Sequence, residues 1–380
     1  MSGPPWAGRG PVLGLIVNPI AGMGGSVGLK GTDTAAILSE ARARGAVPQA
    51  GLRAKVVLDA LAAARPAPAL LAAPGEMGER LARDAGLGLR VVGRSAAGET
   101  SAADTRAAAR AMADAGARLI LFAGGDGTAR DMAAAVGERV PVIGVPAGVK
   151  MHSAVYATSP RAAADLALRA LASEMETRPC EVMDIDEEAF REGTVSARLY
   201  GYISVPYAPD LMQGVKAGGV STDRAALAGI AAEIAGRMEP GRLYILGPGT
   251  TTRAVADALG LPATLLGVDL LRDGAVVSAD AGEDGILRAL AESPPGAIVV
   301  TPIGGQGHFL GRGNQQIGAR VVRAVGLDRL LVAATPQKLA SLRQNTLHVD
   351  TGDATLDRAL AGWRRVITGR GNETVCRVAA

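Results

Sequence analysis

One carboxylate stands inside a glycine-rich turn that directly follows an apolar, strand-like run. Residues 119–128 read Leu-Ile-Leu-Phe-Ala-Gly-Gly-Asp-Gly-Thr, and a helix-forming segment comes next. Glycine backbones approach a phosphate closely and adopt positive φ, while the N-terminus of the following helix attracts anions. Because a carboxylate repels phosphate, Asp126 needs a chemical reason to be there: it accepts the proton of an attacking hydroxyl, or it holds Mg²⁺. The alternative is an ordinary turn in which Asp126 caps the helix.

A second glycine-rich loop follows the first strand-like segment, 12–17. Residues 18–33 read Asn-Pro-Ile-Ala-Gly-Met-Gly-Gly-Ser-Val-Gly-Leu-Lys-Gly-Thr-Asp, so a glycine-rich concave loop precedes a single cation, Lys30. It is not a Walker A loop, because the spacing to the lysine differs and no Ser or Thr follows it. The alternative is a long flexible loop, but the first and fourth strands of such a sheet are usually neighbours, which favours one shared edge. The residues expected to bind phosphate in these two loops are Asn18, Gly22, Gly24, Gly25, Lys30, Gly124, Gly125, Gly127 and Thr128.

A third segment, Pro-Ala-Gly-Val-Lys at 146–150, ends the strand-like run 142–145 and so reaches the same edge. We expect Lys150 to neutralise phosphate charge there. His152 either faces the phosphates as well or is a structural histidine. Two further loops, 74–79 and 98–105, either line the same cleft or only cap the helices that follow them.

In the second half, two loops between strand-like and helical segments carry polar side chains. Residues 247–253 read Gly-Pro-Gly-Thr-Thr-Thr-Arg, and hydroxyls with an arginine at a helix N-terminus suit a carboxylate or a phosphate. Residues 301–316 hold five glycines among polar side chains, a composition that is seldom only a connector. The ligand-binding candidates in these loops are Thr250, Arg253, Gly304, Gly305, Gln306, Arg312 and Asn314. Asp350 or Asp353, at the end of another strand, is a helix cap, a metal ligand or neither, and the cap is favoured.

These motifs need a framework of alternating strands and helices. Apolar runs predict strands at 12–17, 70–73, 89–92, 119–122 and 142–145. Helical patterns occur at 34–44, 53–64, 76–85, 101–115, 129–136 and 160–171. Regular β–α alternation indicates a parallel sheet with helices on both faces. The predicted fold class is therefore α/β, with a Rossmann-like parallel sheet in the N-terminal domain.

Composition changes near residues 175–180, and we place a domain boundary there. Residues 1–176 would form the nucleotide- and phosphate-binding domain and 177–380 the acceptor-binding domain, with the active cleft between them. After strand-like pieces at 181–185 and 198–205, strands are expected at 242–246, 264–268, 297–300, 329–333 and 346–349. Helices are expected at 250–259, 283–292, 314–325 and 354–366. This pattern predicts a second α/β domain.

Composition argues against several other functions. A chain of 380 residues suits two domains, and its net charge of +3 comes from 40 basic and 37 acidic residues that are scattered, unlike a nucleic-acid surface. Cys180 and Cys376 have no neighbour at metal-ligand spacing, and the three histidines are too dispersed for zinc. No signal peptide or membrane-spanning stretch is visible. We therefore expect a cytoplasmic protein with a small-molecule or dinucleotide substrate, and a homo-oligomer is compatible with this.

The motifs carry a resemblance to a known superfamily. GGDGT at 124–128, NPIAG at 18–22 and PAGVK at 146–150 resemble those of NAD kinases, lipid kinases and 6-phosphofructokinases. The longer strings NPIAGMGGSVGLKGTD, FAGGDGTARD, GVPAGVKMHSAV and TPIGGQGHFLGRGNQQ are similar to the predicted ATP-NAD kinase group that includes the acetoin-catabolism accessory protein. The likeness covers nearly the whole chain, and 43–70 least.

This resemblance implies ATP or polyphosphate as phosphate donor, Mg²⁺ as cofactor, NAD as acceptor, and Asp126 as the base that takes the acceptor's proton. Residues 301–304, Thr-Pro-Ile-Gly, are similar to the TPTG stretch of ordinary NAD kinases. Their following Ser-Thr-Ala-Tyr is replaced by Gly-Gln-Gly-His at 305–308.

Three functions remain open on these grounds. The first is an NAD kinase that forms NADP. The second is a kinase of another small hydroxylated metabolite, whose acid group Arg253 and Arg312 would bind. The third is a non-catalytic nucleotide-binding regulator of a catabolic pathway such as acetoin breakdown, which would keep the glycine loops but would not need Asp126. A lipid kinase is disfavoured, because no amphipathic membrane-facing segment is visible.

Overall fold

The computed structural model describes residues 12–29, 35–94, 100–148, 151–185, 197–208, 210–212, 224–292 and 295–380. The chain divides into two compact units. The first lies within Met1–Met23, Gly31–Ala35 and Val47–Gln213, and the second within Gly24–Lys30, Ala36–Ala46 and Gly214–Ala380. The second unit thus includes the middle part of the loop after the first strand, Gly24–Lys30.

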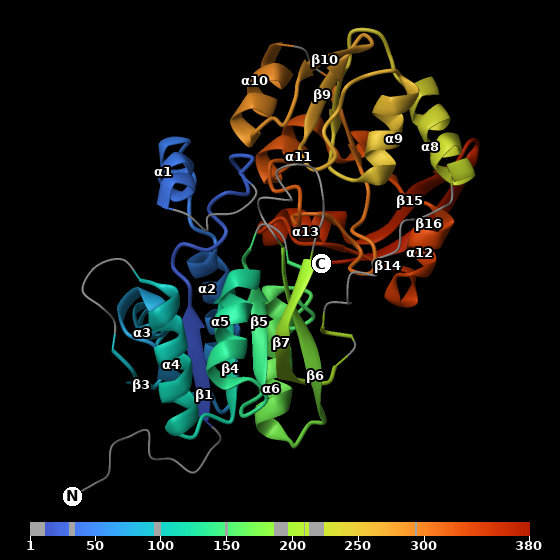
Figure 1. Cartoon of the computed structure of the whole chain (residues 1–380). Coiled ribbons are helices and arrows are strands. Elements are labelled where there is room, and N and C mark those ends of the chain that lie inside the picture. Colours follow the sequence, from blue (N-terminus) through green and yellow to red (C-terminus); the bar gives the residue numbers. More distant parts are fainter. Residues whose placement is uncertain are drawn as a thin grey trace, which may run out of the picture. The chain divides into compact units, whose positions relative to one another are not determined.

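The first unit is built on a five-stranded sheet in the order β3-β2-β1-β4-β5, in which every neighbouring pair is parallel. Its strands are β1 (Val12–Val17), β2 (Ala69–Ala72), β3 (Leu89–Val91), β4 (Leu119–Gly124) and β5 (Val142–Pro146). All five were predicted to within two residues at each end, and the expected adjacency of the first and fourth strands is confirmed. This is the Rossmann-like half that the sequence predicted (Figure 1).

Helices cover this sheet because each parallel strand must be joined to the next by a crossover. The helices of the first unit are α2 (Ala50–Ala63), α3 (Glu79–Asp84), α4 (Ala102–Asp114), α5 (Asp126–Val136) and α6 (Pro160–Ala172), with the 3₁₀ helix η1 (Gly75–Met77). α4 packs against α5, and α2 packs against α6. α4 begins with a capping box, in which the Ser101 side chain accepts from the Asp104 backbone and Asp104 accepts from the Ser101 N–H.

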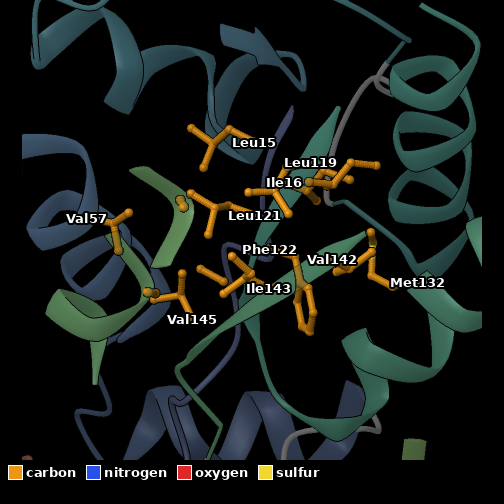
Figure 2. Packing of buried hydrophobic residues seen from close by; sticks show 14 of the residues in the cluster. Leu15, Ile16, Val57, Leu119, Leu121, Phe122, Met132, Val142, Ile143 and Val145 are labelled. Atoms are coloured by element: carbon orange, nitrogen blue, oxygen red, sulfur yellow. The ribbon is translucent and has the colours of Figure 1, made fainter. Parts of the chain in front are cut away.

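The core of the first unit is centred on β4, whose six residues are all buried. A strand covered on both faces is expected to be a continuous apolar run, and Leu119, Leu121 and Phe122 are at most 1% exposed. Figure 2 shows these side chains among those of Leu15 and Ile16 from β1. The Phe122 ring meets Tyr156 edge-on, with ring centroids 5.6 Å apart. β4 is therefore firmly held where its carboxyl end carries the Gly-Gly-Asp-Gly-Thr turn.

An antiparallel hairpin, β6 (Thr177–Ile185) and β7 (Ala197–Pro206), completes the first unit. Val182, Ile203 and Val205 are buried in the same core as β4, and both strands pack against α5. The sequence analysis assigned 177–206 to the second domain. Its buried side chains instead belong to the first unit, because the hairpin covers α5.

The second unit contains a mixed nine-stranded sheet in the order β10-β9-β8-β11-β13-β15-β16-β14-β12. Its strands are β8 (Leu243–Leu246), β9 (Asp269–Arg272), β10 (Ala275–Ser278), β11 (Gly296–Val300), β12 (His308–Leu310), β13 (Leu330–Ala333), β14 (Thr346–Val349), β15 (Gly362–Gly369) and β16 (Asn372–Ala379). β8, β11, β13 and β15 run parallel to one another, whereas β16 reverses direction.

The helices and short 3₁₀ turns of the second unit are α1 (Ala35–Ala43), which follows β1 in the chain, α8 (Arg224–Gly236), which precedes β8, and, between the strands of the sheet, α9 (Thr250–Ala258), α10 (Glu283–Glu292), α11 (Ala319–Val325), η2 (Leu327–Arg329), α12 (Pro336–Ala340), η3 (Arg343–Asn345) and α13 (Ala354–Leu360). Two apolar clusters form around the sheet. One includes Ile230 of α8 and Val255 of α9, and the other includes Ile286 of α10 and Val321 of α11. The expected second α/β domain is confirmed.

Three expectations for the second unit were wrong. The helix expected at 314–325 begins only at Ala319, after a turn at 315–316. The strand expected at 264–268 is a turn, because the backbone N–H and hydroxyl of Thr264 donate to the Asp269 carboxylate. The helix expected to run to residue 366 ends at Leu360, because Gly362 takes a φ of +113° and the following residues form β15. Trp363 to Ile367 is rich in strand-forming residues, and its pairing with β16 outweighs the helical pattern.

No helix in the part of the chain that the structure describes is long and apolar enough to cross a membrane.

Cys180 and Cys376 are free thiols. Burial raises the pKa of both thiols.

We predict that Phe122→Ala lowers the free energy of unfolding of the first unit by about 3–5 kcal/mol, because a fully buried aromatic ring is lost and a cavity remains. Urea titration followed by circular dichroism measures the change. The control is Leu52→Ala, which removes a side chain that is 58% exposed on α2 and should cost less than about 0.5 kcal/mol. Equal losses for the two variants would contradict the packing described.

Candidate active site

The sheet order of the first unit reverses between β1 and β4. From β1 the chain continues to β2 on one side, and from β4 to β5 on the other, so the loops at their carboxyl ends diverge. Ligands of α/β sheets bind at such a switch point. Asn18 joins the two loops: its backbone N–H donates to Ala123 (2.9 Å) and its side-chain amide donates to the Thr128 hydroxyl (3.0 Å). The expected pairing of the two motifs at one sheet edge is thus present.

Glycines let three loops pack backbone against backbone at this edge. A Cβ on Gly148 would lie 2.7 Å from the Cα of Gly125, and one on Gly22 would lie 2.2 Å from the Ala147 carbonyl oxygen. A Cβ on Gly124 would lie 2.4 Å from the Thr128 hydroxyl oxygen. We expected positive φ at the glycines of 124–127. That was wrong: Gly22 has a positive φ, but Gly124, Gly125 and Gly127 do not. At Gly124 and Gly125 a side chain is excluded because its Cβ would collide with neighbouring atoms.

The Asp126 carboxylate holds the third loop in place. One oxygen accepts from the His152 backbone N–H at 2.6 Å, and the other accepts from the Ser153 N–H at 3.2 Å. His152 Nδ1 lies 3.5 Å from the first oxygen. Asp126 is 6% exposed. Two backbone donors occupy part of a carboxylate that offers about four acceptor positions, so the group is oriented yet keeps capacity for another donor.

Ser153, which we did not single out from the sequence, completes this arrangement. It is fully buried, and its hydroxyl donates to the Met183 carbonyl oxygen (2.8 Å) and accepts from the Met183 N–H (3.0 Å). The hydroxyl thereby anchors the loop beneath Asp126 to β6. The sequence offered only a weak indication of this role, because Ser153 is a single serine between His152 and an apolar stretch.

The helix α5 begins at Asp126, earlier than the start expected near residue 129, with Gly125 as its N-cap residue. Asp126, Gly127 and Thr128 therefore form its first turn, where backbone N–H groups have no helical partner and the dipole favours anions. A Cβ on Gly127 would meet no atom within 4 Å. The first turn of α5 thus has room for a side chain at Gly127, one residue after the oriented carboxylate.

The loop after β1 does not stay in one unit. Asn18 and Gly22 belong to the first unit, whereas Gly24 and Gly25 cluster with the second. Within the second unit, a Cβ on Gly25 would lie 3.0 Å from the Gln315 side chain, and the Ser26 carbonyl oxygen accepts from the N–H of Glu283. Lys30 and Lys150, the two cations expected to neutralise phosphate, lie outside the described residues.

The carboxyl ends of β8, β11 and β13 carry a lysine held by two hydroxyls. Lys338 Nζ donates to the Thr251 hydroxyl at 3.1 Å and to the Thr301 hydroxyl at 3.0 Å. Both threonines are buried. Sequence analysis noted 335–338 as a strand end but did not select Lys338, because the contact joins residues 37 and 87 positions apart.

The other candidates of the second unit lie in different surroundings. Thr250 is exposed at the start of α9, and Arg253 forms an exposed ion pair with Asp257 one turn later. Gly304 and Gly305 lie in the turn before β12, with Gly305 at a φ of +76°. Their roles in binding stay predictions.

Gln306, Arg312 and Asn314 are instead buried. The Asn314 side chain closes its own loop, accepting from the Gly311 N–H (3.0 Å) and donating to the Phe309 carbonyl oxygen (2.9 Å). Arg312 lies 3.4 Å from the Asp350 carboxylate. Asp350 therefore pairs with an arginine, and Asp353 caps α13. A binding role for the three buried side chains stays a prediction.

Comparison with known families identifies the chain. The ATP-NAD kinase N-terminal domain matches residues 13–175, and the ATP-NAD kinase C-terminal domain matches residues 241–378. The chain belongs to the ATP-NAD kinase family. No curated protein and no solved structure is similar enough to the chain to give a match. Its closer likeness to the group with the acetoin-catabolism accessory protein stays a prediction.

Kinases of the ATP-NAD kinase family generally use ATP and a divalent metal. Among the residues that the structure describes, no group of three or more His, Cys, Asp or Glu side chains is arranged to hold a metal. Mg²⁺ is commonly bound by one or two carboxylates together with substrate phosphates, and Asp126 supplies a carboxylate at the N-terminus of α5. This single carboxylate is compatible with an ion that arrives with a nucleotide.

We predict a pH-dependent stability from His348 in the second unit. Burial, with a smaller contribution from the positive charge of Arg312, lowers the pKa of His348 to about 4. The unfolded chain takes up a proton near pH 6.5, whereas the folded chain does not until about pH 4. Stability should therefore fall with decreasing pH across this window, by about 1.4 kcal/mol per pH unit.

Urea titrations from pH 7 to pH 4.5 measure this effect, with His348→Gln as the comparison. The variant should show a shallower slope than the unaltered chain, although the neighbouring His308, Arg312 and Asp350 remain. Identical slopes for the two proteins would show that His348 does not titrate as described.

Proposed function

We propose that this protein transfers a phosphoryl group from ATP or polyphosphate to the 2′-hydroxyl of NAD, giving NADP. The observation that carries the proposal is the buried Asp126 carboxylate, held by two backbone N–H groups at the N-terminus of α5 and at the switch point of the sheet. Membership of the ATP-NAD kinase family supports the same conclusion from independent grounds.

The proposed step uses Asp126 to orient and deprotonate the acceptor. The 2′-hydroxyl oxygen forms a bond to the terminal phosphorus of the donor, and the bond from that phosphorus to the bridging oxygen breaks. The hydroxyl proton passes to Asp126, and ADP or a shortened polyphosphate leaves. Fixing the carboxylate by two backbone donors favours this role, since a general base must lie within hydrogen-bond reach of the proton.

Phosphate binding would fall to the first turn of α5. Its N–H groups have no helical partner, the helix dipole favours negative charge there, and a Cβ on Gly127 would meet nothing within 4 Å. Mg²⁺ bound with the nucleotide would neutralise charge on the transferred phosphoryl group. Asn18 keeps the start of the loop after β1 against Thr128, so this part of the loop would lie beside the phosphates together with residues 124–128.

Lys338 is proposed to bind an anionic part of a substrate in the second unit. Two buried hydroxyls hold its ammonium group at the ends of three parallel strands, an edge where α/β sheets place ligands. Thr250 and Arg253, at the start of α9, would help to bind the same substrate.

We predict that Asp126→Asn lowers the rate of NADP formation by about 10²–10⁴-fold, because the amide cannot take a proton. ATP affinity should change little. Asp131→Asn is the control: it alters another buried carboxylate of α5, which pairs with Arg106 at 2.6 Å, and it should reduce stability but retain turnover. Retention of the wild-type rate by Asp126→Asn would remove Asp126 from the reaction.

A second substitution tests the phosphate position. In Gly127→Ala the new methyl group meets no protein atom, so the fold should be retained or stabilised by up to about 1 kcal/mol. The methyl group would occupy the proposed phosphate space and weaken ATP binding by at least about tenfold, as measured by isothermal titration calorimetry. The matched control is Gly285→Ala, in the first turn of α10, where the added Cβ also meets nothing. If both variants bind ATP normally, the phosphates lie elsewhere.

The replacement of Ser-Thr-Ala-Tyr by Gly-Gln-Gly-His at 305–308 favours a second candidate, a kinase of another small hydroxylated metabolite. This segment leads into β12, with Gln306 and His308 buried. The two candidates differ in one assay: NAD should accelerate ATP consumption in the first case and have no effect in the second.

A regulator without catalysis would retain its biological activity in Asp126→Ala.

A further inference from the structure

His152 approaches Asp126 with both its backbone and its side chain. The backbone N–H donates to Asp126 Oδ2 at 2.6 Å, and the ring nitrogen Nδ1 lies 3.5 Å from the same oxygen. The side chains of His152 and Asp126 are only 10% and 5% exposed. The two groups are therefore largely shielded from water, and a polar interaction between them is stronger than at the protein surface.

The segment that follows His152 is held by two strands of the first unit. The Ala154 N–H donates to the Glu181 carbonyl oxygen of β6 at 3.1 Å, and the Gly144 N–H of β5 donates to the Val155 carbonyl oxygen at 2.9 Å. These bonds fix the backbone directly after His152. The ring is therefore placed beside the carboxylate by a rigid support, as a residue that orients a reacting group requires.

The contact between the ring and the carboxylate requires a proton on Nδ1. A carboxylate oxygen only accepts hydrogen bonds, whereas an imidazole nitrogen donates or accepts according to its protonation. With Nδ1 unprotonated, two acceptors would face each other in a buried place, which is unfavourable. The distance of 3.5 Å is longer than an ordinary hydrogen bond of about 2.7–3.2 Å, but the hydrogen bonds of catalytic groups often tighten when the substrate binds.

The two oxygens of Asp126 are engaged unequally. Oδ2 faces the backbone N–H and the ring of His152, whereas Oδ1 accepts from the Ser153 N–H at the longer distance of 3.2 Å. Each donor stabilises negative charge on the oxygen that it contacts. Oδ1 is therefore the oxygen that is better able to accept a proton.

We propose that His152 is a positioning residue for phosphoryl transfer: it donates from Nδ1 to Asp126 Oδ2 and thereby leaves Oδ1 to the hydroxyl of the acceptor. This inference rests on the proposed function. As the new bond from oxygen to phosphorus forms, the hydroxyl proton passes to Oδ1, and the donor's bridging oxygen leaves with the electrons of the bond that breaks. His152 keeps its own proton throughout and acts only by holding the carboxylate in one orientation.

Two variants of similar shape separate the donor from the bulk of the side chain. In His152→Asn the amide nitrogen can take the place of Nδ1, whereas His152→Leu has the same branching without a donor. His152→Leu should lower kcat for NADP formation by about tenfold to a hundredfold, because the carboxylate is less well oriented. KM for ATP and for NAD should change by less than about threefold, and His152→Asn should recover most of kcat. Equal kcat values for the two variants would overturn the proposal.

The position of the proton is measured independently of activity. The chain has three histidines, so long-range ¹H–¹⁵N NMR spectra of full-length protein labelled with ¹⁵N-histidine identify the His152 signals by their loss in His152→Leu. We expect a proton on Nδ1 of His152. A neutral ring protonated at Nε2 would overturn the inference even if NADP forms. Failure of the proposed function is distinct from this, because the unaltered protein would then form no NADP from either donor while Nδ1 carried its proton.

Discussion

The hydrogen bonds from the backbone of His152 and Ser153 to Asp126 organise the candidate active site. They place a carboxylate at the start of a helix and close the loop after β5 onto the loop after β4. Closure is feasible because Gly125 and Gly148 approach without side chains, and because Ser153 fixes the far side of the loop to Met183. Without the carboxylate, two buried or partly buried N–H groups would lose their acceptor, which is costly.

In this arrangement the structural role of Asp126 and its proposed chemical role both depend on a carboxylate that accepts hydrogen bonds. As an acceptor of backbone donors, it orders the loop, and in the proposed reaction the same oriented carboxylate would accept a proton from a substrate hydroxyl. The surrounding sheet supplies rigidity, since β4 is buried along its whole length and Phe122 is packed on Tyr156. The proposed chemistry would thus depend on a strand that cannot shift without disturbing the core.

Sequence patterns predicted the first unit well because its strands and helices are determined by signals that are local in the sequence. Apolar runs of β1 and β4, glycines at their ends and helices between them determine a parallel sheet with few alternatives. The same patterns predicted the position of Asp126 but not its partners. Ser153 and Met183 meet across 30 positions, and Lys338 reaches Thr251 across 87. Such contacts depend on packing, which periodicity does not record.

The second unit was predicted less accurately for a related reason. β15 and β16 pair with each other along their length, so tertiary pairing outweighed a helical pattern that seemed to continue to residue 366. Buried polar residues such as Arg312 and Asn314 looked like ligand contacts in a glycine-rich loop, yet their observed bonds lie within the unit. Density of polar residues identifies a constrained loop but does not distinguish a binding role from a structural one.

The central claim is that phosphate passes from a nucleotide or polyphosphate to NAD beside Asp126. The most direct measurement is to incubate the purified full-length protein with Mg²⁺, NAD and either ATP or polyphosphate, and to quantify NADP by an enzymatic cycling assay. The account predicts NADP that accumulates in proportion to protein and time with at least one donor. Absence of NADP with both donors, in protein shown by circular dichroism to be folded, would contradict it.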